Sequence, residues 1–216
     1  MKTTSQTNKA AAVGFWRWFA ANADRLKMLY SAKLYEQLAG EMNRELDKID
    51  SRLAWEIGGG LTLPSLLTIS GEGSRELTNI AEFVVKSAPN LKDWEFYASR
   101  PARSAPNAVQ FPGSAERYEA SNWEFVPIER PERGRLDLII VDDQLAAASR
   151  ERALMAVSIY LDQALGEEKV EAWIGTLSVE SRAAVLGKRA FKIEELPEYL
   201  LWVTHRENNP LKQTAG

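Results

Sequence analysis

The apolar residues of this chain change their period in the same order twice, and this order limits the fold more than any other feature of the sequence. Residues 53–57 alternate between apolar and polar or small side chains, which is the two-residue period of a strand with one buried face. Glycines follow, and residues 66–69 are predicted to form the second strand of a hairpin. Ser74 then caps a helix with apolar residues three and four positions apart, and residues 94–99 are again typical of a strand. The predicted order is strand, strand, helix, strand.

The second half of the chain repeats this order. Residues 121–126 and 136–141 have the composition of strands, and the turn residues at 129–135 between them predict a second hairpin. A helix is predicted over about 145–165, and a closing strand is predicted at 170–175. We interpret the two halves as copies of one duplicated unit. Two unrelated α+β halves that obey the same packing rules are the alternative.

Aromatic side chains, F-W-R-W-F, stand near the start of the chain. Phe15, Trp16 and Phe19 share one face of a helix, so we interpret them as an anchor that packs on the predicted sheet or its helices. An exposed aromatic pair that binds a partner is the alternative. A longer helical pattern runs from about 22 to 46, and Gly40 inside it is expected to divide it into two helices.

These elements together predict an α+β protein. N-terminal helices are followed by two tandem strand-strand-helix-strand units, which form a mainly antiparallel sheet with helices packed on one side, and a short C-terminal helix closes the chain. The units are expected at about 51–100 and 121–177, and the last helix is expected at about 193–205. The chain then divides into a disordered N-terminus at 1–12, a single α+β domain at 13–205 and a flexible tail at 206–216.

The composition of the chain argues against several classes of protein. Its 216 residues include no cysteine, so disulfides, thiolate metal sites and cysteine nucleophiles are absent. The formal net charge of −3 argues against nucleic-acid binding, which usually needs a basic surface. The first residues are polar or alanine rather than continuously apolar, and no window approaches the ~20 apolar residues that cross a bilayer. We therefore expect a cytoplasmic protein that binds neither nucleic acid nor membrane.

No residue pattern in the chain predicts a catalytic, metal or cofactor site. Asp142 and Asp143 follow an apolar strand, where paired carboxylates can hold a divalent cation, but we expect Asp143 to cap the next helix instead. Asp137 in the same strand is expected to face solvent by alternation. His205 is the only histidine, it precedes a polar tail, and no G-x-S-x-G sequence occurs, which argues against a serine hydrolase. We predict no catalytic residue, no bound metal and no cofactor.

Charged side chains of the central connection and the second hairpin are the best candidates for a binding surface. Arginine forms bidentate contacts with carboxylates and stacks on aromatic rings, and arginine and tryptophan are both frequent at interface hot spots. We predict that an acidic partner binds six residues: Arg100, Arg103, Trp123, Arg130, Arg133 and Arg135. A solvated surface of mixed charge is the alternative, because glutamates accompany these arginines.

Several short motifs resemble those of a known group of proteins. They are the F-W-x-W-F opening followed by N-A-D-R-L, then W-E-I-G-G, then A-P-N-L-K-D-W-E-F-Y-A-S-R-P. These motifs are similar to the W-F-x-x-N-x-x-x-L start and the A-P-x-L-x-x-W strand of a group of uncharacterised bacterial proteins. The resemblance covers most of residues 15–101 and implies a bacterial source. It carries over no site residue, because no activity is established for the group.

The function that these features predict is that of a non-enzymatic protein-binding or regulatory module, of the inhibitor, immunity or adaptor type, with a protein partner. This interpretation depends mainly on the lack of converging catalytic groups. The alternative is a small-molecule or metal-dependent enzyme that uses carboxylates at strand ends.

Overall fold

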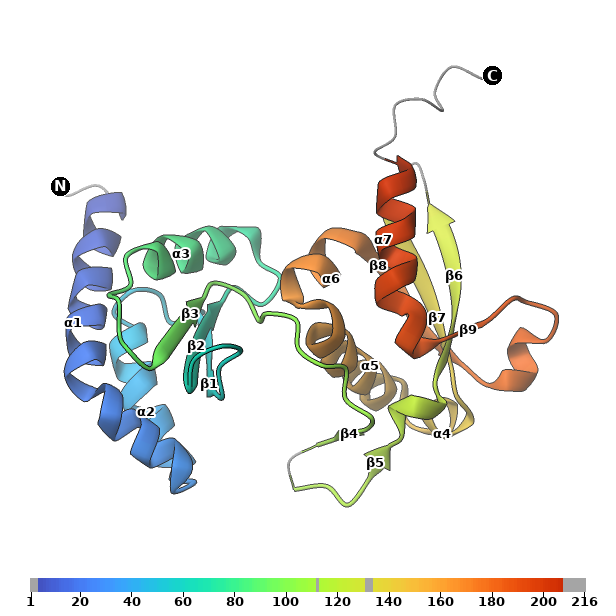
Figure 1. Ribbon diagram of the computed structural model, residues 1–216, viewed down its shortest axis with the longest axis horizontal. Coiled ribbons are helices and arrows are strands. Elements are labelled where there is room, and N and C mark those ends of the chain that lie inside the picture. Colours follow the sequence, from blue (N-terminus) through green and yellow to red (C-terminus); the bar gives the residue numbers. More distant parts are fainter. Residues whose placement is uncertain (1–3, 112, 131–133, 208–216) are drawn as a thin grey trace. The chain divides into compact units, whose positions relative to one another are not determined.

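The chain folds as two compact units, residues 1–100 (unit 1) and residues 101–216 (unit 2), each with its own sheet and apolar core (Figure 1). The computed structural model describes residues 4–111, 113–130 and 134–207. The predicted α+β class is confirmed, with N-terminal helices, two strand-strand-helix-strand units and a short C-terminal helix. Two units take the place of the single domain predicted over 13–205, because the two halves of the chain bury separate sets of apolar side chains. Most of the tail predicted at 206–216 lies outside the described residues.

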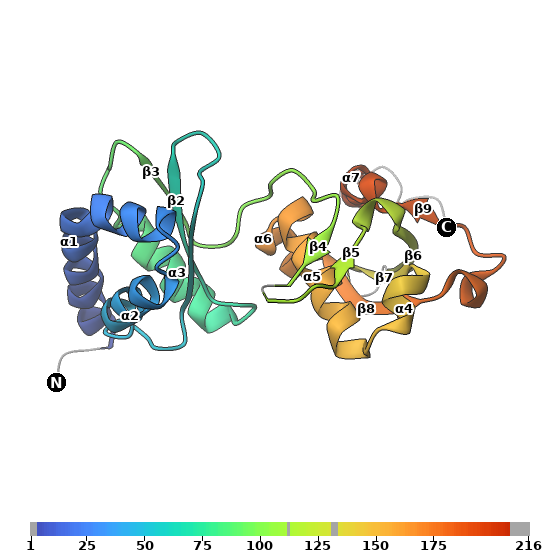
Figure 2. The ribbon, with the colours of Figure 1, turned by 90° about the horizontal axis from the view of Figure 1, so that it is seen from below.

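Unit 1 is built from helices on one face of a three-stranded sheet. Its elements are α1 (Thr4–Ser31), α2 (Tyr35–Leu46), β1 (Ala54–Gly58), β2 (Ser65–Ser70), α3 (Arg75–Lys86) and β3 (Trp94–Tyr97). β1 pairs antiparallel with β2, and β2 pairs parallel with β3. α1 and α2 lie side by side (Figure 2), and all three helices pack on the sheet face that carries Ile57, Leu67 and Ile69. Helices on one side of the sheet are as predicted.

The N-terminal helices have bounds that differ from the predicted ones. α1 starts at Thr4, so most of the segment predicted to be disordered, 1–12, is helical. The helix breaks at Lys33, which has a left-handed backbone conformation (φ 58°), and not at Gly40, which lies inside α2. Buried apolar side chains continue at every fourth position on both sides of Gly40. Packing of this face outweighs the cost of one glycine in the helix.

The aromatic opening is a packing anchor, as predicted. Phe15, Trp16 and Phe19 are all buried, with at most 4% of each side chain's surface exposed. The Trp16 indole N–H donates a hydrogen bond to the Val84 carbonyl of α3 at 2.7 Å. The Phe19 ring meets the Trp94 ring of β3 edge to face, with centroids 4.9 Å apart. These contacts join α1 to both α3 and β3.

Unit 2 repeats the strand order of unit 1 and extends it. Its strands are β4 (Val109–Gln110), β5 (Arg117–Tyr118), β6 (Glu124–Arg130), β7 (Arg135–Val141), β8 (Ile174–Glu180) and β9 (Phe191–Lys192). Its helices are η1 (Ala120–Asn122), α4 (Asp143–Ala147), α5 (Arg150–Leu165), α6 (Glu167–Trp173), η3 (Arg182–Val185), η4 (Ile193–Glu195) and α7 (Leu196–Glu207). β6 pairs antiparallel with β7, and β7 pairs parallel with β8, which matches β1, β2 and β3 in order and direction. β9 adds to the outer edge of β6, and the main core lies between this sheet and the helices α5 and α7.

The strands form separate sheets in place of the one sheet predicted, and most of the described strand pairs are antiparallel, as predicted, with one parallel pair in each of the two larger sheets. In each unit a helical connection after the second strand returns the chain to the same end of the sheet, so the third strand runs parallel to the second. The closing strand predicted at 170–175 also differs, because α6 continues to Trp173 and β8 begins at Ile174. Gly166 ends α5 with φ 84°, and two glutamates then fall in the first turn of a new helix, where negative charge is favourable.

A buried carboxylate holds an irregularity in the pairing of β7 with β8. Asp137 is 8% exposed, which corrects the prediction that it faces solvent. Its Oδ1 accepts a hydrogen bond from the Thr176 amide at 2.7 Å, where the register shifts between Leu136 and Leu138. A Cβ atom on Gly175 would lie 2.3 Å from this oxygen. The bulge therefore needs glycine at this position.

Candidate functional site

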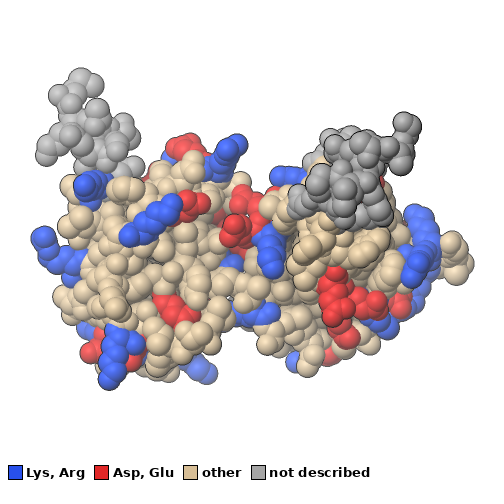
Figure 3. Space-filling model, turned by 45° about the horizontal axis from the view of Figure 1, so that its top comes forward, with Lys and Arg blue, Asp and Glu red and all other residues tan. Residues whose placement is uncertain are grey.

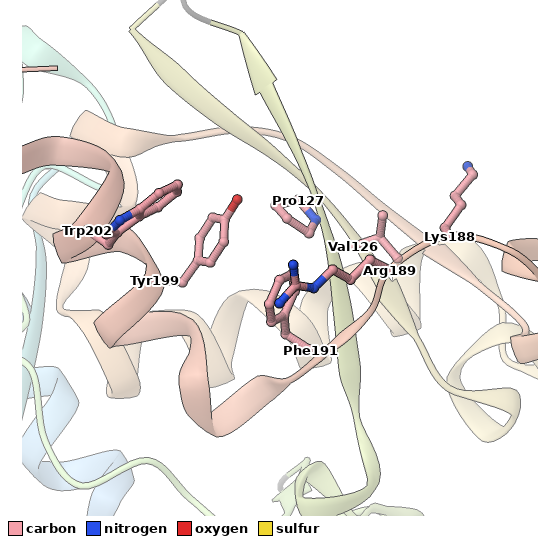
Figure 4. A pocket seen from close by; sticks show the side chains of 7 residues that line it. All are labelled: Val126, Pro127, Lys188, Arg189, Phe191, Tyr199 and Trp202. Atoms are coloured by element: carbon pink, nitrogen blue, oxygen red, sulfur yellow. The ribbon is translucent and has the colours of Figure 1, made fainter. Parts of the chain in front are cut away.

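A pocket of about 620 Å³ lies in unit 2, where α7, β6 and the segment from Lys188 to the start of β9 meet (Figure 4). All three of these segments contribute lining residues: Val126, Pro127, Lys188, Arg189, Phe191, Tyr199 and Trp202. A volume of this size falls within the range of ligand-binding pockets, and such pockets are mostly apolar with a few polar groups. The pocket is the candidate functional site.

The sheet edge beside the pocket is open. β9 pairs only with the first two residues of β6, so from Val126 onward none of the described strands lies on that side. The Ile193 amide donates a hydrogen bond to the Trp123 carbonyl at 3.1 Å. Because backbone groups alternate in direction along a strand, those of Pro127 point to this same edge. Proline has no N–H to donate there, and an unpaired edge is where a sheet tolerates proline.

The helix α7 supplies aromatic side chains to the other wall of the pocket. Its fully buried residues face the core, whereas Tyr199 and Trp202, one turn apart, line the pocket with ring centroids 5.6 Å from each other. The Tyr199 hydroxyl donates a hydrogen bond to Glu129 Oε1 at 3.1 Å, which fixes this ring over β6. The Trp202 side chain is 52% exposed. One aromatic ring is therefore held over β6, and the next ring is about half exposed at the pocket.

Two basic side chains give the pocket a positive charge. Arg189 lies over the Phe191 ring, with its guanidinium carbon 4.8 Å from the ring centroid, and Lys188 is also exposed. Neither cation has an ion pair among the described residues, whereas Arg152 and Arg182 of the same unit form ion pairs at 2.7 and 2.8 Å. In Figure 3, basic side chains gather at the end of this unit that carries the loop between β8 and β9. None of the described residues that line the pocket is acidic.

The six residues predicted to bind an acidic partner are distributed over both units. Arg100 belongs to unit 1, where it forms ion pairs with Glu56 at 3.5 Å and with Glu72. The Arg103 amide donates a hydrogen bond to the Gln163 carbonyl at 2.7 Å. These two arginines lie in different units.

Trp123 is buried rather than exposed, which corrects its prediction as an interface residue. None of its surface is exposed, and its ring packs in the core 5.4 Å from the ring of Tyr160. Its position just before β6 places the side chain on the face covered by α5. A tryptophan in a core contributes stability and cannot contact a partner.

The predicted hairpin arginines lie at the far end of the β6–β7 pair. Arg130 is the last residue of β6 and faces Arg135, the first residue of β7, and the Arg135 side chain is exposed. Arg133 lies outside the described residues. A role of these arginines in binding stays a prediction.

The carboxylates at the end of β7 have local structural partners. Asp142 accepts a hydrogen bond from the Leu145 amide at 2.9 Å and is the N-cap of α4, a role that we predicted for Asp143. Asp143 accepts a hydrogen bond from the Arg182 amide at 3.0 Å. The described part of the chain contains no cluster of three or more histidine, aspartate or glutamate side chains that could hold a metal ion.

Glu95 has a carboxyl group whose pKa is strongly lowered. Its carboxylate accepts hydrogen bonds from three successive amides of the β1–β2 loop, at residues 61–63, and from the Tyr97 hydroxyl. Desolvation by itself raises the pKa of Glu95, but the hydrogen bonds outweigh it and lower the pKa to about 2. These partners belong to the β1–β2 loop and to β3 itself, so Glu95 ties the loop to β3.

Sequence reasoning missed the pocket residues of the segment 188–191 and of α7. The predicted last helix already contained a usable signal, because its apolar side chains outnumber those that one buried face needs. Tyr199 and Trp202 form a second face next to the buried one. The sequence shows no sign that Arg189 and Phe191 lie beside them, since this depends on the pairing of β9 with β6.

Comparisons with known proteins give no functional information. No protein-family model matches the chain, and no curated protein or solved structure shows significant similarity to it. Among the described residues, no helix has the length and apolar content needed to span a membrane.

Proposed function

We propose that this protein is a non-enzymatic binding or regulatory module, of the inhibitor, immunity or adaptor type, and that it holds a partner protein at the pocket of unit 2. The observation that carries the proposal is the exposed Trp202 beside Tyr199, with two cations at the same pocket that have no described ion pair. Tryptophan, tyrosine and arginine are the residues most enriched at the centres of protein interfaces. Their meeting in one concave site favours binding.

The chemistry of the pocket favours binding over catalysis. Acid–base catalysis needs a group that exchanges a proton near neutral pH, most often histidine or a carboxylate. Among the described lining residues, the ionisable groups are the cations Lys188 and Arg189 and the hydroxyl of Tyr199, which already donates to Glu129. These groups suit the recognition of negative charge next to apolar surface.

The predicted arginine hairpin belongs to the same proposal. Pro127 and Arg130 are three residues apart on β6, which is about 10 Å along an extended strand. A partner seated in the pocket therefore reaches the end of the hairpin, where Arg135 is exposed. A bacterial source, which the resemblance described above implies, and the cytoplasmic location expected from the sequence are also part of the proposal.

The test compares two variants of α7 with matched exposure. Leu201 and Trp202 are each 52% exposed, but only Trp202 lines the pocket. Immobilised wild-type protein and the variants Trp202→Ala and Leu201→Ala are incubated with bacterial lysate, after thermal unfolding shows that both variants fold. A partner kept by Leu201→Ala and lost by Trp202→Ala supports the proposal. Equal retention of every captured protein by both variants contradicts it.

A further inference from the structure

We infer, given the binding function proposed above, that the pocket takes an acidic and aromatic segment of the partner, bound through its side chains and not as an added strand. The first step, the negative charge of the bound segment, follows from the charge of the pocket. The chain as a whole has a net charge of −3, yet the described residues that line this pocket include two cations and no acid. Opposite charge across an interface favours association, and like charge is rejected. The segment that fits is therefore negatively charged.

The arrangement of the lining gives the second step. Figure 4 shows Trp202 and Tyr199 at one side of the pocket and Lys188 at the other, with Phe191 and Arg189 between them. The Phe191 ring lies 5.3 Å from the Tyr199 ring and 4.8 Å from the Arg189 guanidinium, so one side chain separates the aromatic wall from the cationic one. In an extended segment, residues two apart face the same side and lie about 7 Å apart. An aromatic residue and an acidic residue two positions apart match both walls.

The backbone of β6 gives the third step. An added strand needs N–H and carbonyl groups at alternate positions of the open edge. Pro127 occupies the edge position that lines the pocket and has no N–H to donate. The next residue whose backbone faces this edge is Glu129, near the end of the strand. Proline here protects the edge from strand addition, so recognition depends on side chains.

The experiment uses synthetic peptides as probes and the full chain as receptor. An eight-residue fluorescent peptide, in which tryptophan and glutamate take turns at the odd positions and serine fills the even ones, is compared with peptides in which lysine replaces glutamate or alanine replaces tryptophan. Fluorescence anisotropy at low and moderate salt gives each Kd. We expect the glutamate–tryptophan peptide to bind at least tenfold more tightly than either control, with affinity that falls as salt rises. Equal binding of the lysine peptide overturns the inference.

A charge-reversal variant tests the same contact from the side of the protein. The double variant Lys188→Glu, Arg189→Glu changes two exposed residues, and we expect it to reverse the preference and bind the lysine peptide more tightly. An unchanged preference overturns the inference. A peptide with N-methylated backbone amides is expected to bind within about twofold of its parent, whereas a tenfold loss indicates strand addition and contradicts the third step.

The outcomes separate this inference from the proposed function. If Trp202→Ala loses a captured partner but the peptides show no charge preference, the binding function stands and the inferred chemistry is wrong. If indole-3-acetate binds as tightly as the peptide, the site serves a small aromatic acid and the inferred segment is wrong. If Trp202→Ala affects neither peptide nor partner, both the inference and the proposed function fail.

Discussion

Replacing Trp16 by alanine tests whether the aromatic opening holds unit 1 together. The side chain is 4% exposed and meets the Phe96 ring edge to face, with centroids 4.7 Å apart. A buried tryptophan removes about 150–250 Å² from water, which at about 25 cal/mol per Å² corresponds to about 4–6 kcal/mol. This value is an upper bound, because the unfolded chain already buries part of its surface. We expect a loss of about 3–5 kcal/mol, the usual range for a buried tryptophan changed to alanine.

The hydrogen bond of Trp16 adds little to this loss. Its indole donates to the Val84 carbonyl at 2.7 Å, but that carbonyl also accepts hydrogen bonds from the amide and the hydroxyl of Ser87. The acceptor therefore keeps partners in the variant, and the penalty of an unpaired buried group does not arise. The loss is mainly one of packing.

Urea unfolding followed by circular dichroism measures the effect, with Trp18→Ala as the control. Trp18 lies in the same helix but is only half-buried, so its loss is expected to be smaller. A loss of about 3–5 kcal/mol is a large part of the stability of a domain, and it should appear in the transition of unit 1 alone. Equal midpoints for the two variants would refute the reasoning. Wild-type unfolding of Trp16→Ala with altered partner binding would instead assign this residue to an interface.

Three further changes test other parts of the chain. Gly175→Ala is expected to destabilise unit 2 by about 1–3 kcal/mol in thermal unfolding, because the added Cβ atom would collide with Asp137. Gly40→Ala is the control: its added Cβ atom has no atom within 4 Å, so the variant should be as stable as the wild type or more stable. The pKa of Glu95 is about 2 in the folded protein, against an ordinary value of 4.5, so its stabilising effect is full above pH 4.5 and is lost as the pH falls towards 2. Glu95→Gln should therefore reduce the change of the free energy of unfolding between pH 4.5 and pH 2. An unchanged pH dependence would contradict this role of Glu95. The last variant replaces three arginines of the hairpin by serine: Arg130, Arg133 and Arg135. It should fold with a change of under about 1 kcal/mol and bind an acidic partner more weakly at low salt, and unchanged affinity at low and moderate salt would make this hairpin a solvated turn.

The local elements of this protein could be predicted because their signals lie in neighbouring residues. The two-residue alternation around Trp55 and the hairpins that follow gave the same order of strands and helix in both halves, and the structure has that order. The helical spacing of Phe15, Trp16 and Phe19 correctly predicted a buried face. Such patterns report which side of an element is apolar, and burial of that side is a strong physical requirement.

Tertiary structure alone decided which elements pair and which side chains remain available. Residues 170–173 fit a strand or a helix equally well by composition, and packing against α5 and the sheet selects the helix α6. Trp123 is equally suited to a core or an interface, and the approach of α5 buries it. The pocket exists because β9 pairs with only two residues of β6. The residues just before β9 do not pair with β6, and Arg189 and Phe191 line the pocket together with residues of α7. These outcomes depend on contacts between residues far apart in the chain, whose free energies do not follow from any local pattern.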